Sequence, residues 1–105
     1  MALPTLTDEQ RAEYSKRAAA ARKARADLKA RIKRGEVALE TVLGSEDPVV
    51  LRMRVRDLLV SLPGVGPKKA GKLMDEAGIA GSRRVSGLGI RQREKLLEAY
   101  GEAVA

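Results

Sequence analysis

A single long helix is predicted for the first third of the chain. Thr7 to Gln10 fits the capping-box pattern, in which the Thr hydroxyl and the Gln side chain accept hydrogen bonds from backbone N–H groups that a helix start leaves unpaired. Alanine, arginine, lysine, glutamate and leucine dominate from there to Gly35, and glycine is common just past a helix end. A helix of about 27 residues is roughly 40 Å long.

The apolar side of this helix is narrow. On a helical wheel Tyr14, Ala21, Leu28 and Ile32 share one stripe, which is weak in its first half because alanine is the main apolar residue there. We therefore expect the C-terminal half to dock on the rest of the protein and the N-terminal half to project. A row of cations lies beside the stripe: Arg11, Arg22, Arg25, Lys29 and Lys33. This row suits the phosphates of a duplex, or it is simply the solvated face of an Ala-rich helix.

The rest of the sequence predicts short helices and no strand. Residues 37–43 suit a two-turn helix that is ended by Gly44. Asp47 and Pro48 supply an N-cap and a first helical residue, and the apolar spacing beyond them continues that helix to Leu62. Its core-facing positions are Val55, Leu58, Leu59 and Leu62.

Two further helices follow a turn over residues 63–67. The first begins at Pro67, ends at Gly78, and turns Ala70, Leu73, Met74 and Ala77 inward. A loop over residues 80–89 comes next. The last helix runs from about Ile90 to Tyr100, is ended by Gly101, and faces inward with Leu96, Leu97 and Tyr100.

These segments predict an all-α fold, with a basic helical arm over residues 1–34 and a compact helical domain over residues 35–105. The arm carries a net charge of +6, residues 35–61 carry −2, and residues 62–105 carry +3, which gives the total of +7. Such a distribution indicates a polyanionic partner, nucleic acid above all. The alternative is a charged helix that its own side chains keep in solution.

The composition excludes several chemistries. The 105 residues include no cysteine, no histidine and only two aromatic side chains, both tyrosine. This removes disulfides, Cys or His zinc sites, thiol nucleophiles, imidazole-based triads and aromatic platforms for stacking bases. Neither a transmembrane segment nor a secretory signal is visible. We expect an intracellular protein that binds no metal, cofactor or membrane and is not an enzyme.

The sharpest motif is the run Leu62-Pro63-Gly64-Val65-Gly66-Pro67-Lys68-Lys69-Ala70. Two glycines in a tight turn let the backbone approach another molecule closely, and the N–H groups that open the next helix form an anion site beside three lysines. The run resembles the helix–hairpin–helix motif, whose hairpin holds a nucleic-acid phosphate through backbone amides. The alternative is a plain helix–helix turn with glycines for close packing.

The stretch from Gly78 to Ile90 is too long for a hairpin and implies a helix–two-turn–helix arrangement over about residues 55–101. Together with Leu3-Pro4, the run from Leu6 to Arg11, the Ala/Arg helix, Arg83-Arg84 and Leu88-Gly89, it resembles the actinobacterial integration host factor family. The resemblance covers nearly the whole chain. It implies an all-helical, nucleoid-associated protein that binds duplex DNA with little sequence preference, bends or compacts it, and assists phage site-specific recombination.

By position, the resemblance places DNA contacts on the hairpin and on the later loop. These residues are Gly64, Val65, Gly66, Lys68, Lys69, Lys72, Arg83 and Arg84. The family often has another basic residue where this chain has Ser86, which can hydrogen-bond a phosphate but cannot neutralise it. Contacts from Arg22, Arg25 and Lys29 of the first helix are expected to compensate on the same or a second duplex.

The partners expected are double-stranded DNA in the cytoplasmic nucleoid and a phage integrase, with the protein itself a monomer. A second resemblance is to the small-subunit ribosomal protein S13 family, which implies ribosomal RNA as the partner. That family typically ends in a long basic tail, whereas this chain ends in Gly101-Glu102-Ala103-Val104-Ala105. Formamidopyrimidine-type glycosylases share the motif, but they need an N-terminal proline and a second catalytic domain that this chain lacks.

Overall fold

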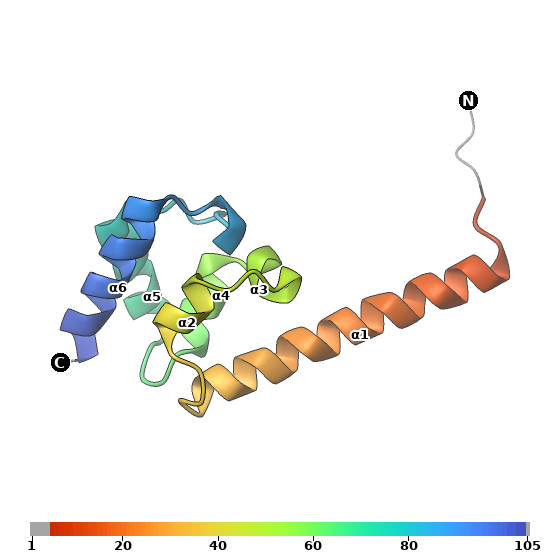
Figure 1. Ribbon diagram of the computed structural model, residues 1–105, viewed down its shortest axis with the longest axis horizontal. Coiled ribbons are helices and arrows are strands. Elements are labelled where there is room, and N and C mark those ends of the chain that lie inside the picture. The colour runs from red at the N-terminus through yellow and green to blue at the C-terminus, as the bar shows by residue number, and fades with distance from the viewer. Residues whose placement is uncertain (1–4, 105) are drawn as a thin grey trace.

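Helices make up nearly all of the regular structure. The computed structural model describes residues 5–104, so Leu3 and Pro4 lie outside the described part. The elements in order are α1 (Asp8–Lys33), α2 (Leu39–Leu43), α3 (Pro48–Arg52), α4 (Val55–Ser61), α5 (Pro67–Ala77), the 3-10 helix η1 (Val85–Gly87) and α6 (Ile90–Val104). Residues 5–104 contain no β-strand, only an isolated bridge between Arg54 and Arg84. The predicted all-α fold is confirmed (Figure 1).

The start of α1 is fixed by the predicted capping box. The Gln10 amide donates to Thr7 Oγ1 over 3.1 Å, and the Thr7 amide donates to Gln10 Oε1 over 2.9 Å. Arg34 caps the other end, and Gly35 follows with φ +77°, in the left-handed region that favours glycine. Both predicted ends of the long helix are therefore confirmed.

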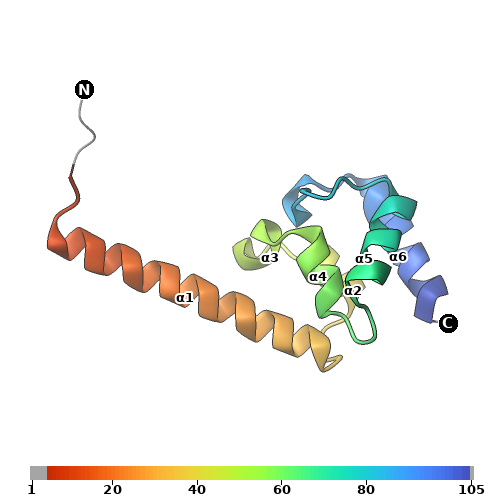
Figure 2. The ribbon, with the colours of Figure 1, turned by 180° about the vertical axis from the view of Figure 1, so that it is seen from behind.

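The C-terminal half of α1 docks on the rest of the protein. Ile32 is 0% exposed, Leu28 is half-buried, and Tyr14 is 71% exposed. Figures 1 and 2 show the first half of α1 extending away from the other helices. The predicted docking and projecting halves are thus observed, although Tyr14 at the start of the stripe has no core contact.

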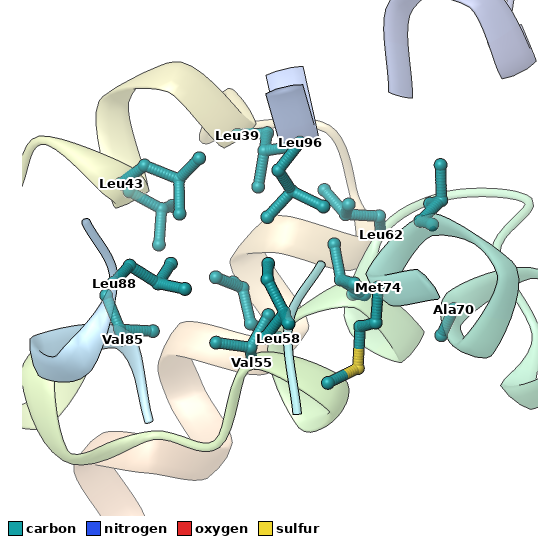
Figure 3. Packing of buried hydrophobic residues seen from close by; sticks show 14 of the residues in the cluster. Leu39, Leu43, Val55, Leu58, Leu62, Ala70, Met74, Val85, Leu88 and Leu96 are labelled. Atoms are coloured by element: carbon teal, nitrogen blue, oxygen red, sulfur yellow. The ribbon is translucent and has the colours of Figure 1, made fainter. Parts of the chain in front are cut away.

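The core lies among α2, α4, α5, α6 and the segment around η1. Leu58 and Val55 of α4 lie at its centre, with Leu96 of α6 and Val85 of η1 packed against them (Figure 3). The left-handed cap at Gly78, with φ +69°, ends α5 where the sequence predicted. These apolar contacts hold α5 and α6 side by side and fix the ends of α5 in space.

The helix predicted from Pro48 to Leu62 is wrong in one respect, because it is two helices. Met53 and Arg54 are extended between α3 and α4, with ψ of 143° and 140°. The extended pair lets Val55 donate to the Arg83 carbonyl over 3.0 Å and lets the Met53 carbonyl accept from Val85 over 2.9 Å. Pairing with a distant loop therefore outweighs continuation of the helix.

Three boundaries also differ from the sequence prediction. The helix expected over residues 37–43 begins at Leu39, because Ala38 is extended and forms its N-cap. The last helix passes through Gly101 and continues to Val104, since glycine weakens a helix near its end without stopping it. The loop predicted over residues 80–89 contains η1.

Ile32→Ala is expected to lower the free energy of unfolding by about 2–5 kcal/mol, because it removes buried apolar atoms and leaves a cavity under α1. Tyr14→Ala removes a larger side chain from the same helix and is expected to change stability by less than about 0.5 kcal/mol, because Tyr14 is exposed. Urea unfolding followed by far-UV circular dichroism measures both. Equal losses would contradict docking by the C-terminal half alone.

Candidate nucleic-acid interface

The turn between α4 and α5 is a tight hairpin that depends on Gly64. This glycine has φ +75°, and a Cβ placed on it would meet no atom within 4 Å, so the backbone conformation and not space requires glycine. The amide of Val65 donates to the Leu62 carbonyl over 3.2 Å, and the Val65 side chain is 6% exposed. Val65 therefore holds the hairpin against the core. Its amide is used within the turn, and the DNA contact expected at Val65 stays a prediction.

The first turn of α5 is open to solvent. Gly66 is its N-cap and Pro67 its first residue, and no side chain caps the helix. The first backbone bond of the helix is from Ala70 to the Gly66 carbonyl, 2.9 Å, so the amides of Lys68 and Lys69 have no carbonyl partner within α5. These amides and the positive end of the helix dipole form a site for an anion. We call Gly66, Lys68 and Lys69 the hairpin surface.

The three lysines of α5 are exposed, opposite its buried apolar side, as the sequence predicted. Lys69 and Lys72 line a shallow groove between α5 and α6 that also holds Glu76 and Glu102. The two lysines and two glutamates give this groove no net charge. Lys68 does not line the groove. Of the three, Lys68 and Lys69 are placed next to the open amides.

The loop that carries Arg83 and Arg84 is tied to the body of the protein. The Arg84 guanidinium donates to the Arg52 carbonyl, the last of α3. Arg83 lies across Gly87, and its Nη1 donates to the Gly87 carbonyl over 3.1 Å. Ser86 is exposed in η1. Both arginines are exposed but held in place, so the loop presents its charges from a fixed backbone.

The structure does not bring the hairpin and the arginine loop together. They lie at opposite ends of α5, with the hairpin low and the loop around η1 high in both views (Figures 1 and 2). The eleven residues of α5 span about 16 Å at the usual rise per residue. The two predicted phosphate sites are therefore separate.

The expected contacts on α1 divide between these two ends. Arg25 lines a small cleft of about 190 Å³ together with Arg52 at the end of α3. Arg52 is also the residue whose carbonyl accepts from Arg84. Arg22, one turn earlier, is exposed. Lys29 is half-buried and faces α4 and the start of α5. We call Arg25, Arg52, Arg83 and Arg84 the arginine surface.

Two basic residues near these sites were missed by reasoning from sequence. Arg52 and Arg56 belong to residues 35–61, whose net charge of −2 hid them. Each lies in a cleft with a cation of α1: Arg52 with Arg25, and Arg56 with Lys29. The signal that could have found them is the alternation of arginine at positions 52, 54 and 56.

No residue of either surface takes part in the ion pairs of the described part of the chain. Arg17 pairs with Glu13 over 3.4 Å, and Glu36 pairs with Arg34 over 3.0 Å and with Arg31 over 3.9 Å. The hydrogen bond from Arg34 lowers the pKa of the Glu36 carboxyl below its usual value. Across residues 5–104 no acidic side chain lies within ion-pair distance of the basic residues on the hairpin and arginine surfaces.

None of the helices in the described part of the chain is long and apolar enough to cross a membrane. Neither do those residues contain a cluster of acidic side chains that could hold a metal ion.

The chain is similar to known proteins in sequence and in structure. A family model described as "S13-like H2TH domain" matches residues 32–100. A protein named Integration host factor from Mycobacterium tuberculosis is 54% identical to this chain, and the match covers 98% of this chain and 100% of that protein. A protein of the same name from Streptomyces coelicolor is 48% identical, and the match covers 96% of each chain.

A solved structure described as sIHF bound to an 8bp palindromic DNA is 44% identical, with a TM-score of 0.77 over 82% of this chain and 99% of that chain. The family resemblance drawn from the sequence is confirmed by these matches. With this level of identity over nearly its whole length, the chain belongs to the integration host factor family of mycobacteria and Streptomyces.

Proposed function

We propose that this protein binds the phosphate backbone of double-stranded DNA with little sequence preference, and that it is a binding protein and not an enzyme. The observation that carries the proposal is the uncapped start of α5, where open amides lie beside Lys68 and Lys69. The DNA complex of a structural relative supports the choice of partner. Amides, lysine and arginine contact phosphate and carry no direct sequence information.

The separation of the hairpin and arginine surfaces supports a role in shaping DNA. Two separate phosphate-binding regions can hold two points of one duplex, straight or bent, or two duplex segments. Bending one duplex or joining two segments compacts DNA. We further propose that the protein acts in the nucleoid as a monomer and assists site-specific recombination beside a phage integrase. The names of the relatives support the last of these roles.

Ribosomal RNA is the second candidate partner. The description of the matching family model as S13-like favours it. A basic hairpin that holds phosphates through amides suits RNA as well as DNA, and the partner therefore has to be measured directly. Titrations against a random-sequence DNA duplex and a structured RNA, at two salt concentrations, separate the two candidates.

Unrelated DNA duplexes are expected to bind within about tenfold of each other, because phosphate contacts do not read bases. Affinity is expected to fall steeply as salt rises, since binding releases counterions. Fluorescence anisotropy with several duplexes at two salt concentrations measures both effects. A preference of several hundredfold for one sequence, or for structured RNA over duplex DNA, would contradict the proposed function.

The variant Arg83→Ala with Arg84→Ala is expected to flatten the log–log salt dependence of DNA binding by roughly 1.8 units, because two phosphate contacts are lost. The single variants should differ in stability. Arg84→Ala loses the bond to the Arg52 carbonyl that joins the loop to α3, whereas Arg83→Ala loses a bond within the loop. Thermal unfolding is expected to show the larger loss, about 1 kcal/mol, for Arg84→Ala. An unchanged salt slope would remove the loop from the interface.

Arg22→Glu with Arg25→Glu is expected to abolish condensation of long DNA without unfolding the protein. Both side chains are exposed, and glutamate and arginine have similar helix propensity. Sedimentation or single-molecule extension of long DNA at about 0.1 M salt, where charges are incompletely screened, measures condensation. The charge-preserving variant Arg22→Lys with Arg25→Lys is the control. If the glutamate variant condenses DNA as well as the parent protein does, this part of α1 is only a solvated face that does not contact DNA.

A further inference from the structure

A basic cleft lies between the C-terminal half of α1, the side of α4 and the start of α5. Its volume is about 460 Å³. The lining includes Lys29 and Lys33 from α1, Arg56 and Asp57 from α4, and Pro67 from α5. The cleft thus joins three elements that are distant in sequence, and the first residue of α5 forms part of its wall.

The charges in this cleft are not balanced within the protein. Three cations face one carboxylate, that of Asp57, and none of them lies within ion-pair distance of an acidic group in residues 5–104. Lys29 is half-buried, whereas every other basic residue of α1 is exposed. Removing an ammonium group partly from water without a counter-charge costs free energy, so an anion in the cleft would be favoured.

The position of Arg56 is coupled to α5 through Gly71. A Cβ on Gly71 would lie 3.6 Å from Arg56 Nη2, so the guanidinium rests against the helix at a site that carries no side chain. Gly71 is the fifth of the eleven residues of α5, about one turn from Pro67. The Arg56 guanidinium therefore lies beside α5, although the residue as a whole is exposed.

We propose that Lys29, Lys33 and Arg56 bind phosphates of the same DNA strand that the hairpin surface holds. The inference rests on Pro67, which is common to both sites. Pro67 lies between Gly66 and Lys68 of the hairpin surface, and it also lines the cleft. A strand that reaches the open amides meets the three cations next. The occupant is the backbone of duplex DNA, so the inference rests on the proposed function.

This assignment determines which part of α1 shares a duplex with the hairpin. Lys29 and Lys33 lie on the hairpin side, whereas Arg25 lies in the other cleft, with Arg52. One helix therefore contributes cations to both ends of the protein, and its C-terminal turns belong to the hairpin end.

The test uses the full chain and a short duplex of random sequence. Lys29→Gln with Arg56→Gln is expected to weaken binding by about tenfold or more at 0.1 M salt and to flatten the salt slope by roughly 1.8 units, as expected for two lost phosphate contacts. Lys16→Gln with Lys95→Gln removes the same charge from exposed positions outside the cleft, and it is expected to keep the parent slope. Arg56→Lys keeps the charge and is expected to retain most of the affinity.

Circular dichroism and thermal unfolding confirm that each variant is folded, and the single variants Lys29→Gln and Arg56→Gln replace the pair if it is not. If the parent protein binds the duplex and the cleft variants match it in affinity and slope, the cleft assignment is overturned while the proposed function stands. If the parent protein does not bind the duplex, both are overturned. A loss seen with an RNA duplex and not with DNA would overturn the assignment to DNA.

Discussion

Two backbone hydrogen bonds join Met53 and Val55 to Val85 and Arg83, and the arrangement of the basic residues depends on them. They form where the chain is extended between α3 and α4, and Val55 and Val85 are both fully buried beside them. Because the bonds hold the loop before α6 against the end of α3, the arginine surface includes residues from three parts of the chain. The buried Val85 and the bond from Arg84 to the Arg52 carbonyl hold the same loop, so Arg83 and Arg84 keep a fixed position relative to α3.

The attachment of α1 is the second constraint, and it is small. Ile32 is fully buried, Leu28 is half-buried, and Ala21 and Arg25 lie beside α3. The first half of the helix is stabilised by its own backbone bonds and its capping box. A helix held at one end acts as a rigid arm, because its direction is set by the turns that pack. The burial of Ile32 therefore decides both where Lys29 faces and how far the first half of α1 reaches from the core.

Features that depend on local chemistry could be predicted from the sequence. Thr7 with Gln10, Asp47 with Pro48, and Gly78 each act on the nearest few residues, and the structure shows the element ends that they predict. The break at Met53 and Arg54 has no glycine or proline to mark it, because its cause is a partner some 30 residues away. The cleft positions of Arg52 and Arg56 likewise depend on tertiary packing.

The placement of the ion pairs bears on how the protein would recognise a polyanion. Carboxylates pair with basic residues near the start of α1 and in the turn after it, and the hairpin surface, the arginine surface and the cleft are left without such pairs. An anion that binds there has no internal ion pair to break, and its binding releases counterions. The chain also has no histidine, and hence no imidazole that gains or loses charge near neutral pH. Ionic strength, and not pH, is therefore the condition to which such an interface responds.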